Sequence, residues 1–256
     1  ADRAYFRAGI IAFNEKDYEG ARTQFRTVVE RYASSPLAVN ALRELADVEF
    51  RLTHFADASS NYQAYAARTN GAECAYALYR AGFSEFSRER YGDAVVLLKR
   101  SSELFGGGEG QARSLLLAGT AYYNAKQYAE ALAVYRTVIG PLEAAGSTND
   151  ALLDAYYNAA NTYAAAGNED EAAPLYEKIL TRFPASRYTD EISMKLADIS
   201  FVKRSYTRSA EYYERIAQGG GAYAAEARVK RGEALIEAGD YRNAIVVLYG
   251  FITDMP

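Results

Sequence analysis

The residue types that most often do chemistry are scarce in this chain. It has one histidine, His54, and one cysteine, Cys74. A single cysteine excludes an intramolecular disulfide and a cysteine-rich zinc site, and a single histidine excludes metal motifs built on histidine pairs. His54 has no serine or cysteine near it in a recognisable nucleophile motif, so we interpret it as a surface loop histidine. Cys74 is interpreted as a small helix-packing residue.

Clusters of carboxylates and glycines have plainer explanations than catalysis. The run 168–171 (NEDE) suits the start of a helix, where the helix dipole favours negative charge. The glycines of 106–110 (GGGEG) lack the Lys-Ser/Thr of a phosphate loop, and the sequence has no EF-hand, GxSxG or HExxH spacing. We therefore expect a protein that is not an enzyme, with no catalytic residues, no cofactor and no metal.

Composition indicates a folded protein with a mildly acidic surface. The 256 residues include 29 Lys+Arg and 33 Asp+Glu, giving a net charge of −4, and half of them are apolar. That balance argues against nucleic acid or anionic membrane as the main partner, because both are bound through basic surface. No apolar run approaches the roughly 18 residues that a membrane-spanning helix needs. Tyrosine is unusually frequent, at 23 residues against 11 phenylalanines and no tryptophan.

A spaced pattern recurs seven times along the chain. Each copy has a small residue, an aromatic nine residues later, a small residue three further on, and an aromatic or leucine after four more. The copies begin at Gly9, Ala46, Gly82, Gly119, Ala160, Ala197 and Gly232, at intervals of 35 to 41 residues. Polar breaks such as 14–17 (NEKD) and 124–127 (NAKQ) divide each copy, which predicts two antiparallel helices. One hairpin buries too little apolar surface alone, so neighbours must stack.

This pattern resembles that of the tetratricopeptide repeat family over about residues 2–252. Only Glu169, in an aromatic slot, departs from it badly. The resemblance implies an all-α fold, a right-handed α-solenoid of about seven helix-turn-helix repeats in a single array over residues 1–256. The expected repeats span about 2–36, 39–70, 75–105, 112–140, 153–185, 190–218 and 225–252. At the connector 140–150 we expect a change of superhelical angle and no domain boundary.

Ligands of that family usually bind in a concave groove lined by the first helix of each repeat. Carried onto this sequence, the resemblance implies a peptide-binding groove formed by Asn40, Arg43, Phe50, Tyr76, Tyr79, Phe83, Phe86, Arg113, Tyr123, Asn124, Tyr157 and Asn161. Tyr76, Tyr79, Phe83 and Phe86 share one helix face, and rings with polar tips suit an extended peptide. The alternative is that several of these rings pack against the adjacent repeat. Arg43 is followed one turn later by Asp47, which opposes a carboxylate clamp.

We therefore expect a non-catalytic scaffold that binds a protein or peptide partner, with no nucleic acid and no direct membrane insertion by this segment. The alternative is a regulatory or spacer domain of a larger enzyme or cell-envelope complex, since helical patterns at both ends suggest a fragment of a longer chain. Self-association through the terminal repeats is a third hypothesis.

Two connectors bear on the compartment. The turns at 30–36 (ERYASSP) and 182–188 (RFPASRY) resemble those of bacterial cell-envelope tetratricopeptide proteins, such as the outer-membrane assembly lipoprotein and Tol-associated groups. The resemblance implies a bacterial periplasm or cell envelope, with the cytoplasm as the alternative.

Overall fold

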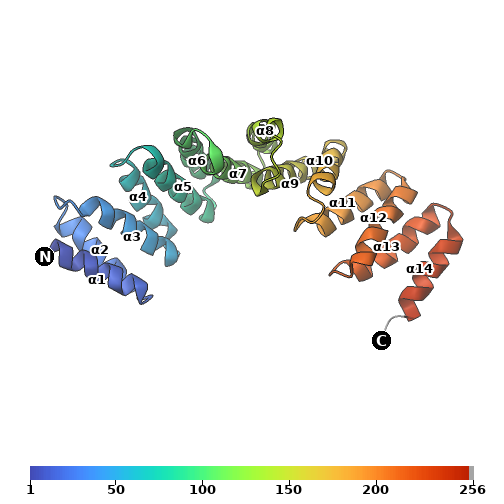
Figure 1. Ribbon diagram of the computed structural model, residues 1–256, viewed down its shortest axis with the longest axis horizontal. Helices are drawn as coiled ribbons and strands as arrows, with labels where there is room; N and C mark the ends of the chain where they lie inside the picture. The colour runs from blue at the N-terminus through green and yellow to red at the C-terminus, as the bar shows by residue number, and fades with distance from the viewer. Residues whose placement is uncertain (254–256) are drawn as a thin grey trace. The chain divides into compact units, whose positions relative to one another are not determined.

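The computed structural model describes residues 1–253, and every regular element in that range is an α-helix. The helices before the 140–150 connector, with the one that enters it, are α1 (Asp2–Asn14), α2 (Tyr18–Arg31), α3 (Ala38–Arg51), α4 (Phe55–Ala66), α5 (Gly71–Ser87), α6 (Tyr91–Phe105), α7 (Gly108–Asn124) and α8 (Tyr128–Ala144). Those after it are α9 (Asp150–Ala165), α10 (Glu169–Arg182), α11 (Thr189–Val202), α12 (Tyr206–Gly219), α13 (Ala224–Glu237) and α14 (Tyr241–Thr253). Figure 1 shows them as successive hairpins.

The polar breaks within the repeats fold into one recurring turn. In each of them the residue two positions before the second helix has a left-handed backbone: Lys16, Thr53, Glu89, Lys126, Gly167, Arg204 and Gly239. The next N–H reaches back to a carbonyl five residues earlier, as from Asp17 to Ala12 and from Asn168 to Tyr163, both at 2.9 Å. This is the Schellman arrangement that ends a helix, so the breaks stop one helix and start the next as expected.

The pattern residues meet inside each hairpin. The second small slot is buried throughout, from Ala21 to Ala244, and Phe25, Tyr62 and Leu98 in the last slot are fully buried. The first small slot lets the two helices approach closely: a Cβ on Gly82 would lie 2.6 Å from Cγ of Leu98. The predicted all-α solenoid of about seven helix-turn-helix repeats is confirmed in its class.

The chain divides into two compact units, residues 1–141 and 142–256, at a point within α8. Within the first unit α2 packs on α3, α4 on α5 and α6 on α7. Within the second, α10 packs on α11 and α12 on α13. Each unit therefore stacks the second helix of one repeat on the first helix of the next. A single array over both units stays a prediction.

Candidate functional site

Four of the hairpins end in a buried tyrosine whose hydroxyl meets a polar side chain fifteen residues earlier. The pairs are Tyr62–Asp47, Tyr135–Thr120, Tyr176–Asn161 and Tyr213–Asp198. A buried phenol needs a hydrogen-bond partner, and the first helix of the same hairpin supplies it. Asn161, predicted to line the groove, accepts this bond from Tyr176 at 2.6 Å. Its amide oxygen is thus engaged inside the hairpin.

The same positions link successive first helices. Arg80 of α5 donates from Nε to the Tyr62 hydroxyl at 3.0 Å, and its Nη2 lies 3.6 Å from Oδ1 of Asp47 in α3. Its guanidinium also lies 4.0 Å from the centre of the Phe50 ring. In the other unit Lys230 lies 3.1 Å from Asp198. The exposed face of the first helices is therefore laced by ion pairs between repeats.

The predicted groove aromatics Phe50, Phe83 and Phe86 belong to a row of rings. Phe50 lies 5.3 Å from Phe55 and 5.5 Å from Phe83, measured between ring centres. Phe83 lies 6.5 Å from Phe86, which in turn lies 5.7 Å from Tyr91 of α6. Tilted and edge-on rings at these distances attract one another. The three side chains are half-buried and contribute to packing between elements.

A hollow of about 520 Å³ opens over α1, α3 and α5. It is lined by Phe13, Arg43, Glu44, Asp47, Tyr65, Ala72, Glu73 and Tyr76. Two predicted groove residues, Arg43 and Tyr76, thus share one site. Tyr76 is 45% exposed and is the most exposed of the predicted aromatics.

Charge in this hollow is mostly negative. Arg43 lies 2.6 Å from Glu44, and this bond holds the pKa of the guanidinium above its usual range. Tyr65 donates to Glu73 at 3.3 Å, and burial raises the pKa of Tyr65, so the hydroxyl stays protonated at neutral pH. Three carboxylates with one guanidinium, beside phenol rings, suit amide donors or a cationic group.

The other predicted residues of the first unit differ in exposure. Tyr79 is half-buried against the core cluster around Ala94, Leu98 and Ala118, and burial raises its pKa. Tyr123 is half-buried with its ring centre 5.7 Å from that of Tyr128. The fully exposed members are Asn40, Arg113 and Asn124.

In the second unit Tyr157 is engaged by its neighbours. Its ring stacks on Tyr188 with centres 3.8 Å apart and planes 4° from parallel. Its hydroxyl donates to the Glu191 carboxylate at 2.8 Å. Burial, followed by this bond, raises the pKa of Tyr157 to about 12. Neither Tyr157 nor Asn161 presents a free polar group in the described arrangement.

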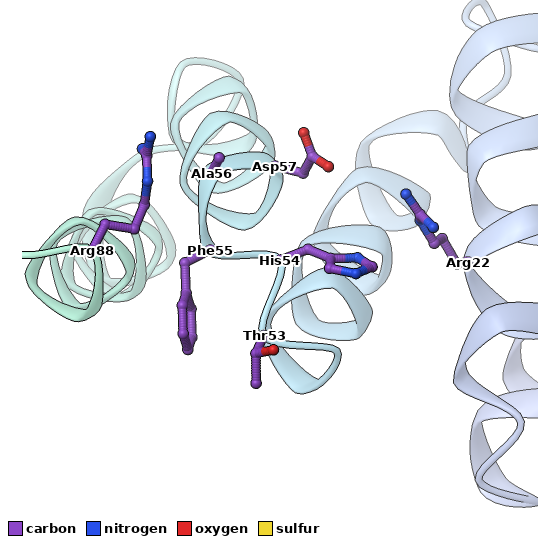
Figure 2. A pocket seen from close by; sticks show the side chains of 7 residues that line it. All are labelled: Arg22, Thr53, His54, Phe55, Ala56, Asp57 and Arg88. Carbon is purple, nitrogen blue, oxygen red and sulfur yellow. The ribbon is translucent and has the colours of Figure 1, made fainter.

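A second hollow, of about 380 Å³, surrounds the turn between α3 and α4. Figure 2 shows His54 and Arg22 extending toward one another, with Phe55 and Arg88 beyond the turn. His54 is the N-cap residue of α4, and its side chain remains 39% exposed. Its placement in a surface turn agrees with the sequence interpretation.

Beneath this hollow lies a buried carboxylate that sequence reasoning missed. Glu49 of α3 is fully buried and accepts bonds of 2.9 Å from Arg22, from Arg26 and, across the turn, from Nδ1 of His54. Arg22 and Arg26 are 27 and 23 residues away in sequence. No spacing rule connects them with Glu49, and only the stacking of α2 on α3 brings them together.

Catalytic and metal chemistry find no support in the part of the chain that the structure describes. No three His, Cys, Asp or Glu side chains among residues 1–253 are grouped so that they could hold a metal ion. Cys74 is buried in a cluster with Leu42 and Leu78, as expected of a packing residue. In the same range no helix combines the length and apolar character needed to cross a membrane.

Comparison with known proteins supports the repeat assignment. Tetratricopeptide repeat models match residues 6–53, 113–140 and 154–186. A tetratricopeptide repeat protein from Parabacteroides merdae ATCC 43184 superposes with a TM-score of 0.62 at 15% identity, over 98% of this chain and 92% of that one. MamA gives 0.58 at 21% identity, over 71% and 91% of the two chains, and YrrB 0.54 at 20%, over 72% and 88%. No curated protein sequence matches the chain.

Proposed function

Taking the chain as an α-solenoid of tetratricopeptide repeats, we propose that it is a non-catalytic scaffold that binds a segment of a partner protein on the face of its first helices. Tetratricopeptide repeats are in general protein-interaction modules. One structural neighbour, YrrB, is described as having an unusual peptide-binding site. The observation that carries the proposal for this chain is the hollow over α1, α3 and α5 with exposed Tyr76 at its edge.

The chemistry of the hollow defines what it would bind. Tyr76 and Phe13 offer ring surface for an apolar side chain, while Glu44, Asp47 and Glu73 offer acceptors for backbone N–H groups. A peptide carboxylate would meet these three carboxylates, so the site does not suit a chain terminus. An internal segment with a basic or apolar side chain fits better.

Substitution of Tyr76 tests this assignment. The purified chain is immobilised and exposed to extract from the source cells, and captured proteins are identified by mass spectrometry. Tyr76→Ala is expected to lose the partner that the unaltered chain captures, with its melting curve unchanged because the ring is largely exposed. Tyr223→Ala removes a similarly exposed ring from the other unit and is the matched control.

A photo-crosslinker at position 76 gives the second measurement. It is expected to join the partner through one defined peptide, found by mass spectrometry. Retention of the partner by Tyr76→Ala, or crosslinks only from other positions, would remove the hollow from the binding surface.

We further propose a cell-envelope setting, on the connectors alone. Both connectors adopt the same turn: Ser35 N–H bonds the Tyr32 carbonyl at 2.8 Å, and Ser186 N–H bonds that of Phe183 at 3.0 Å. Their likeness to envelope tetratricopeptide proteins supports this setting. Fractionation of the source cells, with the protein found only in the cytosol, would contradict it.

A further inference from the structure

The outer face of α14 exposes residues of a kind that other second helices bury. In each second helix, the residue four after the first helical residue points toward the next repeat. This position, here called the outer slot, holds Ser59 in α4, Val95 in α6 and Ala210 in α12, all buried where the next first helix packs. In α14 the outer slot holds Ile245, which is 67% exposed. Tyr241, Tyr249 and Ile252 extend this apolar face.

The outer face of α1 shows the complementary exposure. Two residues after the first small slot, first helices turn a side chain toward the preceding repeat: Val48 in α3, Ser84 in α5 and Ala234 in α13 are fully buried there. The corresponding residue of α1 is Ile11, which is 57% exposed. The described chain therefore carries both halves of an inter-repeat junction, each uncovered.

We propose that α14 of one copy receives α1 of a second copy, repeating the packing used between successive repeats. The chemistry of the two faces agrees slot by slot. At the α2–α3 junction, Arg22 and Arg26 meet Glu49. In the proposed junction the slots of the two arginines hold Ile245 and Tyr249, and the Glu49 slot holds Ala12.

No charge is therefore buried without a partner in these slots, and apolar surface covers apolar surface. A foreign helix would need to reproduce this register, whereas α1 already has it. The contact joins two different surfaces, so it is heterologous and adds copies end to end. Its strength is expected to persist at high salt, because exposed ion pairs are screened and apolar contacts are not.

The first test is sedimentation of the purified 256-residue chain over a wide concentration series. Mass is expected to rise with concentration. Ile245→Asp is expected to weaken association by about tenfold or more, since it places an unpaired charge in the contact. Val246→Asp is the matched control: Val246 is also exposed, and its counterpart Val96 faces solvent at 68% exposure within the stack.

The second test separates this contact from a symmetric one. Ile11→Asp and Ile245→Asp are each expected to be monomeric, yet their mixture forms a one-to-one dimer, because each variant keeps the half that the other lost. Circular dichroism and melting confirm that the variants fold. A chain that stays monomeric at every concentration overturns the proposal. So does association that survives in Ile11→Asp, or that Val246→Asp destroys as fully as Ile245→Asp.

Discussion

At the scale of single residues, the tyrosine surplus has a structural cause. A tyrosine ends a hairpin where the residue fifteen positions earlier is polar, as with Tyr62 and Asp47. Where that residue is Ile10 or Phe83, the hairpin ends in Phe25 or Leu98 instead. The hydroxyl is thus present where an acceptor exists to satisfy it.

Exchange of these residues tests the rule. Tyr62→Phe is expected to cost about 1–2 kcal/mol, because Asp47 and Arg80 both lose a bond to the hydroxyl. Phe25→Tyr is expected to cost about 1–3 kcal/mol, because its hydroxyl would be buried opposite Ile10. Urea unfolding of the two variants against the unaltered chain measures both. A neutral Tyr62→Phe would show that the hydroxyl is incidental.

Tyrosine burial also makes stability depend on alkaline pH. Burial raises the pKa of Tyr135 from 10.0 to about 12. The unfolded chain then ionises first, so the contribution of Tyr135 is complete below about pH 10 and is lost as the pH rises toward 12. The urea midpoint is expected to fall across that window. Tyr135→Phe should flatten part of the fall, and an unchanged slope would contradict the assignment.

At the scale of elements, helix existence and pairing followed from spacing, while side-chain partners did not. The recurring aromatic slot and polar breaks predicted the helix pairs, because helix ends and close helix contacts have local sequence requirements. Glu49 shows the limit. Its partners Arg22 and Arg26 are set by the angle at which α2 crosses α3, which no residue spacing encodes.

The same limit applies to the candidate site. Arg43 and Tyr76 were predicted and share a hollow, but Phe13 and Tyr65, which complete it, come from α1 and α4. Exposure of the predicted rings also depends on packing between repeats: Phe83 lies in a row of rings while Tyr76 projects outward. Helical spacing places both on one face and does not distinguish them.

The α2–α3 junction yields a prediction about asymmetry. Glu49 is fully buried, whereas Arg22 and Arg26 remain 23% and 41% exposed. Removing both arginines by alanine substitution leaves a poorly compensated buried charge and is expected to cost about 3–5 kcal/mol. Glu49→Leu should cost less, because the freed arginines can turn to water. Hydrogen exchange of the α3 amides measures both, and the reverse order would contradict the argument.

At the scale of the whole molecule, stability is expected to be local. Second helices pack on the next first helices within each compact unit, so each repeat depends chiefly on its neighbours. A loss at one hairpin should then fade along the stack rather than reach every helix equally. Gly82 offers a clean perturbation, because an added Cβ would meet the fully buried Leu98 at 2.6 Å.

Gly82→Ala is expected to cost about 1–3 kcal/mol, since overpacking forces α5 and α6 apart. Amide exchange should accelerate most in those two helices, less in α4 and α7, and not at all in α13 and α14. Gly92→Ala, where an added Cβ has no neighbour within 4 Å, is the matched control and should leave exchange in α5 unchanged. Equal acceleration in all the helices would mean that the chain unfolds as one cooperative body, because only a single all-or-none transition spreads a local loss evenly.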